Sequence, residues 1–101
     1  MRTDMLTTYA VLDTTEAHRL IKRLCAHWSH KLTVEVEDGL GRIDFGESRC
    51  LLIADTEQLH IKLDCPDEAT TERMHHVVFD HLKRMTKAGL TEPVWSSSNV
   101  E

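Results

Sequence analysis

The densest group of chemically reactive side chains is the segment 25–31, which reads Cys-Ala-His-Trp-Ser-His-Lys. His27 and His30 are three residues apart, so they are neighbours if the segment is helical, and two neutral imidazoles so placed can share one divalent metal ion. Two histidines alone are a weak metal signal, because most metal sites use three or four protein ligands. The alternative is structural, since cationic side chains favour the C-terminal end of a helix. Both interpretations stay open.

Cys25 and Cys50 are the candidates for a nucleophile, with His27 or His60 as the general base. Both cysteines follow the apolar pattern, and thiols at such positions are usually buried and unreactive. The three cysteines of the chain fit neither a disulfide framework nor a paired metal knuckle. We therefore expect reduced thiols, no catalytic residue and no enzyme activity, with a small cysteine- and histidine-dependent enzyme as the alternative.

Hydrophobic periodicity predicts two helices that position these residues. Asp13 can cap the first helix together with Glu16, and apolar residues then recur at helical spacing, which predicts a helix over 15–30. Pro66-Asp67 starts a second helix over 68–87, in which His81 falls inside the apolar stripe, as a hydrogen-bonded structural histidine would. Nothing in the spacing requires a site that combines both helices.

Alternating hydrophobicity predicts an opening strand over 5–12 and a four-strand antiparallel meander over 33–37, 40–46, 50–54 and 58–65. One face is apolar, and Val36 is expected on it. The other mixes acidic and basic residues, which indicates cross-strand salt bridges rather than acid–base chemistry. The run Leu51–Ile53 breaks the alternation, so its buried side stays open. Outward Leu51 and Ile53, or an exposed Phe79, would favour an isologous homodimer.

These elements predict an α+β two-layer sandwich, an antiparallel sheet with both helices on one face. Their order is strand, helix, four strands, helix, which is similar to the TATA-binding-protein-like topology. We expect a single domain over 1–95, in which 90–95 forms an edge strand or packing strap, followed by a mobile tail over 96–101.

Composition narrows the function classes. The 101 residues are 41% hydrophobic and carry a net charge of −5, as expected for one globular domain. The chain has neither an apolar run long enough to span a membrane nor a signal peptide, so we expect a cytoplasmic protein. Ten acidic but only three basic residues lie between positions 35 and 68. This excess of acid argues against binding to nucleic acid or to an anionic membrane.

The string at 25–31, followed by Gly-Arg-Ile-Asp-Phe-Gly at 41–46 and by Cys50, resembles the bacterial domain-of-unknown-function family numbered 2218. Asp80-His81-Leu82 and Trp95 also fit, so the resemblance covers about residues 5–95. It implies a small bacterial protein without an assigned activity and points to iron through siderophore uptake. Carried over residue by residue, the family pattern singles out Cys25, His27, Trp28, His30, Lys31, Asp44, Phe45, Gly46 and Cys50.

We therefore expect a binding module in which His27, His30, Lys31 and Asp44 engage a metal, an anionic small molecule or a protein partner. Packing rarely requires the identity of an exposed polar residue, so these four are the candidate site. His27 and His30 are the candidate ligands of a divalent metal or iron, whereas Lys31 would suit a carboxylate or phosphate. A structural homodimer is a further alternative.

Overall fold

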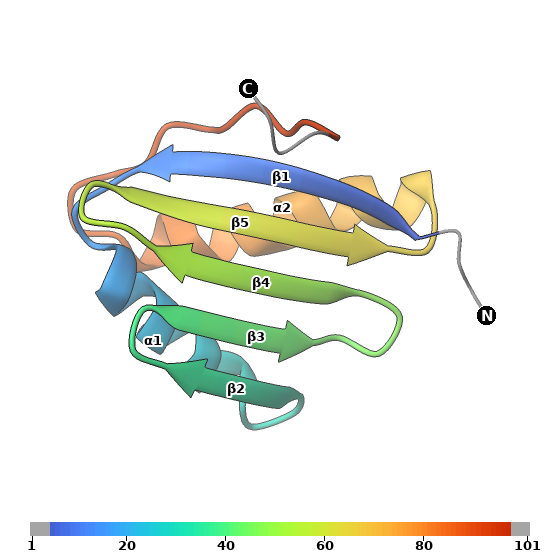
Figure 1. Ribbon diagram of the computed structural model, residues 1–101, viewed down its shortest axis with the longest axis horizontal. Helices are drawn as coiled ribbons and strands as arrows, with labels where there is room; N and C mark the ends of the chain where they lie inside the picture. The colour runs from blue at the N-terminus through green and yellow to red at the C-terminus, as the bar shows by residue number, and fades with distance from the viewer. Residues whose placement is uncertain (1–4, 98–101) are drawn as a thin grey trace.

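The computed structural model describes residues 5–97 and folds them into two layers (Figure 1). This part of the chain forms one antiparallel sheet, with strands in the order β1-β5-β4-β3-β2, and two helices that cover one face of it. The elements in chain order are β1 (Leu6–Asp13), α1 (Ala17–Trp28), β2 (Thr33–Glu37), β3 (Leu40–Asp44), β4 (Arg49–Ala54), β5 (Gln58–Cys65) and α2 (Glu68–Met85). The predicted α+β sandwich, with its order of strand, helix, four strands and helix, is confirmed.

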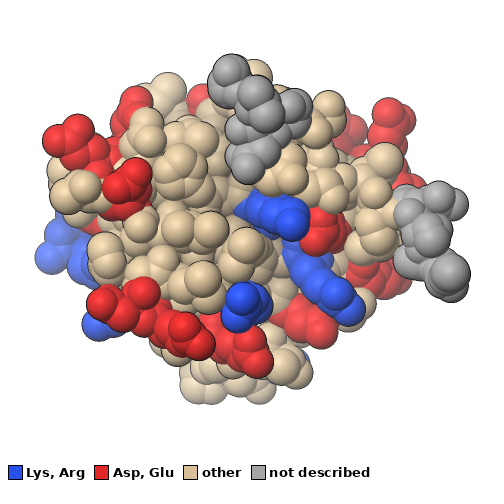
Figure 2. Space-filling view, viewed as in Figure 1, with Lys and Arg blue, Asp and Glu red and all other residues tan. Residues whose placement is uncertain are grey.

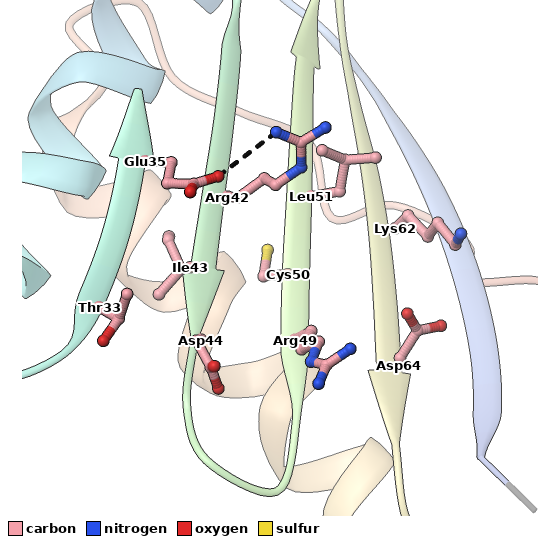
Figure 3. A pocket seen from close by; sticks show the side chains of 10 residues that line it. All are labelled: Thr33, Glu35, Arg42, Ile43, Asp44, Arg49, Cys50, Leu51, Lys62 and Asp64. Carbon is pink, nitrogen blue, oxygen red and sulfur yellow. Dashed lines mark hydrogen bonds and ion pairs between the residues drawn. The ribbon is translucent and has the colours of Figure 1, made fainter. Parts of the chain in front are cut away.

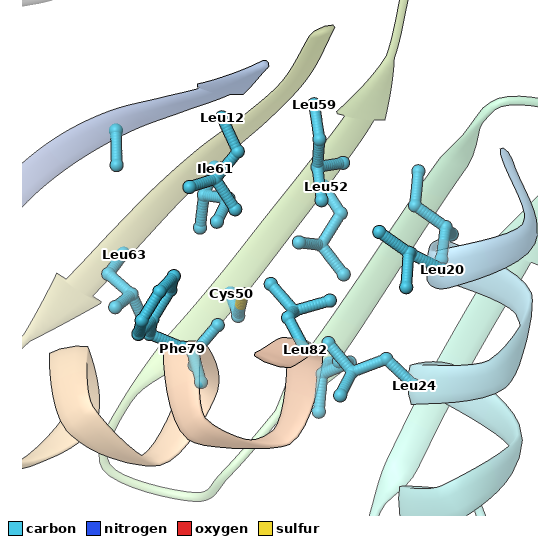
Figure 4. Packing of buried hydrophobic residues seen from close by; sticks show 14 of the residues in the cluster. Leu12, Leu20, Leu24, Cys50, Leu52, Leu59, Ile61, Leu63, Phe79 and Leu82 are labelled. Carbon is cyan, nitrogen blue, oxygen red and sulfur yellow. The ribbon is translucent and has the colours of Figure 1, made fainter. Parts of the chain in front are cut away.

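The core lies between the sheet and the helices, with α1 packed over β2, β3 and β4, and α2 over β1 and β5 (Figure 4). Gly41 on β3 lets α1 come close to the sheet. A Cβ added there would lie 2.8 Å from both Cys25 Sγ and Ile21 Cγ2. The buried side chains that fill the space include Leu12, Leu20, Leu24, Cys50, Leu52, Leu59, Ile61, Leu63, Phe79 and Leu82.

The first helix is shorter than predicted, and the predicted cap by Asp13 is wrong. Asp13 is the last residue of β1 and pairs with Gln58, so sheet pairing holds its backbone extended. The N-cap residue is Glu16, whose side chain makes no capping bond. In the second helix, by contrast, Asp67 accepts a hydrogen bond from Thr70 N at 2.8 Å, which confirms the predicted cap.

Glu16 instead fastens the start of α1 to the loop that follows α2. Its carboxylate accepts hydrogen bonds from Thr86 Oγ1 at 2.6 Å, from the backbone N of Lys87 at 3.0 Å and from Arg19. The Thr86 hydroxyl, then the Lys87 amide and then Arg19 lower the pKa of Glu16 to about 2. The ionised carboxylate therefore joins two segments that are far apart in sequence.

The C-terminal segment 90–96 passes along β1 as a packing strap. Trp95 stacks on His75 of α2, with ring centroids 3.9 Å apart, and Ser96 exchanges two backbone hydrogen bonds with Tyr9. The predicted boundary at residue 95 stays a prediction, although Ser96 belongs to the packed part. Within the predicted tail, residues 98–101 lie outside the described residues. Phe79 is only 8% exposed, so it offers no apolar surface for self-association.

The sheet face turned away from the helices is called the open face below. In β4, Cys50 and Leu52 point into the core, whereas Leu51 and Ile53 point to the open face. Ile53 is 42% exposed, which settles the orientation of the run that breaks the alternation. Val36, expected on the covered face, remains 45% exposed because β2 is an edge strand.

Candidate functional site

An aromatic cluster forms where the C-terminal end of α1 meets α2. His27 lies 4.9 Å from His81, measured between ring centroids, and 5.7 Å from Trp28. Trp28 also contacts His81 at 4.6 Å and Phe45 at 4.9 Å. His27 is exposed, His81 is half-buried and Trp28 is buried. The cluster therefore places two imidazoles against an aromatic wall at the protein surface.

The tautomer of neutral His81 follows from its hydrogen bond. Nδ1 lies 2.7 Å from the carbonyl oxygen of Val77, one turn earlier in α2. Since a carbonyl oxygen can only accept, Nδ1 carries the proton, and Nε2 of the neutral ring has a free lone pair. Metal-binding histidines commonly have this arrangement, in which a backbone carbonyl orients the ring.

The structure brings only part of the predicted site together. The helix ends at Trp28, so His30 and Lys31 lie in the following turn, where both are exposed. The backbone keeps helical angles at Ser29, and the pairing of His27 with His30 stays a prediction. Between residues 5 and 97, His27 makes its ring contacts with Trp28 and His81, and none joins it to His30.

Asp44 lies on the open face, on the opposite side of the sheet from the helices. Its carboxylate accepts a hydrogen bond from Gly46 N at 2.8 Å, which stabilises the turn after β3. Asp44 is therefore not in one cluster with His27. The described residues contain no group of three or more His, Cys, Asp or Glu side chains that could hold a metal ion.

The cysteines have the environment of structural thiols. Cys25, Cys50 and Cys65 are all buried and unpaired by disulfides. Burial raises the pKa of Cys25, and burial together with the nearby cysteines and Asp64 raises the pKa of Cys50 well above the usual range. Because the thiolate is the nucleophilic form, these environments do not activate either thiol.

A pocket of about 390 Å³ lies on the open face across β2 to β5 (Figure 3). Three cationic side chains line it, Arg42 on β3, Arg49 on β4 and Lys62 on β5. A second pocket of about 260 Å³ adjoins it and shares Leu51 and Lys62 with the first. The first pocket is also lined by the acidic side chains Glu35, Asp44 and Asp64.

Sequence reasoning missed the partner of His27 and left open which side of the run Leu51–Ile53 is buried. The contact between His27 and His81 depends on how α1 packs against α2, which helical spacing within one segment does not report. One feature of the sequence indicates that Leu51 and Ile53 point outward. Arg49 lies on the same side of β4 as these two residues, and it pairs in register with the charged Asp44 and Asp64. A charged residue at that position favours the exposed face.

The chain has recognisable relatives. The family model described as an uncharacterised protein conserved in bacteria, DUF2218, matches residues 9–96. The NMR structure of PA4090 from Pseudomonas aeruginosa is similar at 39% sequence identity and a TM-score of 0.79, over 91% of this chain and 96% of that chain. No curated protein matches, and neither described helix is long and apolar enough to cross a membrane. This chain belongs to the bacterial family DUF2218 of uncharacterised proteins.

Proposed function

We propose that the protein is a non-enzymatic module that binds a transition-metal ion through His27 and His81. The observation that carries the proposal is the hydrogen bond from His81 Nδ1 to Val77 O, which leaves Nε2 of the neutral ring unprotonated, in a ring whose centroid lies 4.9 Å from that of His27. Imidazole nitrogen suits zinc, copper, nickel and iron. His81 thus takes the place that the sequence analysis gave to His30.

The spacing of the two rings fits a shared ion. A metal–nitrogen bond of about 2 Å and tetrahedral ligand angles place the centroids of two coordinated imidazoles roughly 5 Å apart. The observed separation is 4.9 Å. Binding then requires adjustment of the ring tilt rather than movement of the helices. Trp28 contacts His81, and Phe45 contacts Trp28. Apolar rings beside a metal site limit the access of water to it.

Two protein ligands leave the remaining coordination positions open. Such a site suits an ion that arrives with other ligands attached, as in a small-molecule chelate, better than a structural ion that needs four protein ligands. Lys31, in the turn after α1, could pair with an anionic chelator. A role in the cytoplasm beside bacterial iron uptake is part of this proposal.

Calorimetric titration with Zn²⁺ near neutral pH tests the proposal. We expect one ion per chain in the wild type, and affinity at least about tenfold weaker in His27→Ala and in His81→Gln. His76→Ala, which removes an exposed histidine of α2, is the matched control and should bind as the wild type does. Circular dichroism checks that each variant is folded.

His30→Ala separates this site from the pair predicted from sequence. If His81 is the second ligand, His30→Ala keeps the wild-type affinity for Zn²⁺. Weak binding in His30→Ala with full binding in His81→Gln would assign the ion to His27 and His30 instead. Equal affinities in all variants and the wild type would contradict both assignments.

A further inference from the structure

The open face carries its cations at the centre of the sheet. Arg42, Arg49 and Lys62 come from three adjacent strands, and Arg42 and Lys62 lie in register with Leu51 on either side of it. Figure 2 shows basic side chains within this face, with acidic side chains close by. Since Glu35, Asp44 and Asp64 line the same pocket, an anion can bind there only at a basic side chain that is not paired with a carboxylate.

The predicted cross-strand salt bridges of this face are present only in part. Arg42 and Glu35 form an exposed pair at 3.5 Å, but among residues 5–97 no ion pair joins Arg49 or Lys62 to a carboxylate. The two aspartates in register with Arg49 are engaged by neutral donors. Asp44 accepts from Gly46 N, and Asp64 accepts from the Thr7 hydroxyl. Both aspartates keep their charge beside Arg49, whereas Lys62 lies in register with the uncharged Leu51 and Tyr9. Lys62 is therefore the main point of attachment for an anion, with Arg49 on the neighbouring strand.

An apolar surface continues from this cationic centre. The smaller pocket is lined by Tyr9, Val11, Leu51 and Ile53, and it shares Leu51 and Lys62 with the larger one. Val11 and Ile53 are 46% and 42% exposed, although each lies within a strand. Leu51 and Ile53 are neighbours on one face of β4, whereas His60 on β5 lies in register between Ile53 and Val11. Exposed apolar side chains grouped in this way commonly mark a binding surface. A ligand that covers them and also contacts Lys62 has an anionic end and an apolar end.

The charges around the open face exclude large anionic surfaces. Acidic side chains border it, with Glu35 and Glu37 on β2 at one side and Asp13 and Asp55 at the end of the strands. A membrane or a nucleic acid would have to approach this rim, whereas a small anion meets only the pocket, where Asp44 and Asp64 lie beside the basic side chains.

We propose that the open face binds a small, free amphipathic anion. Its carboxylate or phosphate group lies at Arg49 and Lys62, and its apolar part covers Leu51, Ile53 and Val11. The larger pocket, at about 390 Å³, lies at the lower end of the range of small-molecule sites. This site lies on the opposite side of the sheet from His27 and His81 and does not depend on the proposed metal site.

The test uses octanoate and octyl phosphate as probes, with octanol and octylammonium as controls that carry the same tail. Amide NMR spectra follow each titration of the full chain. We expect both anions to shift amides of β3, β4 and β5, and the two controls to bind at least about tenfold more weakly. Octanol binding as tightly as octanoate, or shifts confined to the helices, would overturn the proposal.

Variants on the open face localise the interaction. Arg49→Gln combined with Lys62→Gln should weaken octanoate at least about tenfold, and Ile53→Thr should weaken it severalfold. Lys83→Gln combined with Arg84→Gln on α2 is the charge-matched control and should bind as the wild type does. These substitutions are on exposed or half-buried positions, so thermal melting checks that each variant folds. Unchanged octanoate affinity in the double variant would refute the assignment.

Two further measurements distinguish other occupants of this face. Vesicles of phosphatidylcholine and phosphatidylserine should leave the protein in the supernatant, and co-sedimentation that Lys62→Gln abolishes would replace the free anion by a lipid surface. Sedimentation equilibrium should give a monomer. A dimer that Ile53→Asp dissociates would show that a second copy covers the face, and it would overturn the proposal.

Discussion

Because α1 lies close to β3 at Gly41, we expect a larger side chain at this position to destabilise the fold. In Gly41→Ala, the new Cβ would lie 2.8 Å from both Cys25 Sγ and Ile21 Cγ2, two buried atoms on consecutive turns of α1. Carbon atoms gain most from contacts at about 3.5–4.0 Å, so the helix must move outward or the side chains must leave their preferred rotamers. Such overpacking costs about 1–3 kcal/mol.

The entropic gain from replacing a strand glycine offsets about 0.5–1 kcal/mol of this cost. The midpoints of these two terms, about 2 and about 0.75 kcal/mol, give an expected loss of about 1 kcal/mol in the free energy of unfolding for Gly41→Ala. In a domain of this size that corresponds to a fall in Tm of roughly 4–8 °C. Urea denaturation measures the free energy, and an unchanged slope shows that the unfolding transition is the same.

A double-mutant cycle with Cys25→Ala tests the stated cause. Removing Sγ takes away one of the two atoms that the new Cβ meets, so Gly41→Ala should cost less in a Cys25→Ala background. Gly46→Ala is the control, because its added Cβ meets no atom within 4 Å and its φ of 96° is strained for alanine. Its loss of stability comes from the backbone and should be the same with and without Cys25→Ala. Wild-type stability of Gly41→Ala, or strict additivity with Cys25→Ala, would refute this reasoning.

Three more predictions follow from the environments of single groups. Because the folded pKa of Glu16 is lowered from 4.5 to about 2, its stabilising effect is complete above pH 4.5 and fades as the pH falls toward 2; Glu16→Gln should therefore melt below the wild type near neutral pH, and the gap should narrow in acid. All three buried thiols should react slowly with iodoacetamide in the native state at pH 6, and rapid labelling of Cys50 would revive the cysteine-enzyme alternative. Burial, and then His76, lower the pKa of His75 below 6.5 despite an opposing effect of Glu72, so the fluorescence of the stacked Trp95 should titrate below that value when measured in Trp28→Phe; a midpoint above 6.5 would contradict this.

The fold could be predicted because each element carried its own periodic pattern and the turns were too short for anything but antiparallel neighbours. The errors occurred where two interactions competed for one residue. Asp13 had the sequence of a helix cap, but its pairing with Gln58 extends β1 through it. Glu16 had the position of a capping-box partner, but its carboxylate binds Thr86 and the loop after α2 instead.

The candidate site was only partly predictable for a similar reason. His27 could be singled out by its residue type, but its contact with His81, 54 residues later in the sequence, depends on how two helices pack together. His30 was predicted beside His27 because the helix was expected to reach residue 30. The last residue of α1 is Trp28 and His30 lies in the following turn, so this pairing stays a prediction. Strand alternation places Asp44 on the open face, away from His27. The same alternation was used to predict the two faces of the sheet, but it was not applied to the choice of site residues.

The most direct test of the central claim is the NMR spectrum of the histidine ring nitrogens during addition of Zn²⁺ to the wild-type chain. We predict that His81 shows a protonated Nδ1 before addition, and that one equivalent of Zn²⁺ shifts a nitrogen of His27 and Nε2 of His81 together. His18 and His76 should remain unchanged at that ratio. Shifts of His27 with His30 while His81 is unaffected, or no shift of any ring nitrogen, would contradict a metal site formed by His27 and His81.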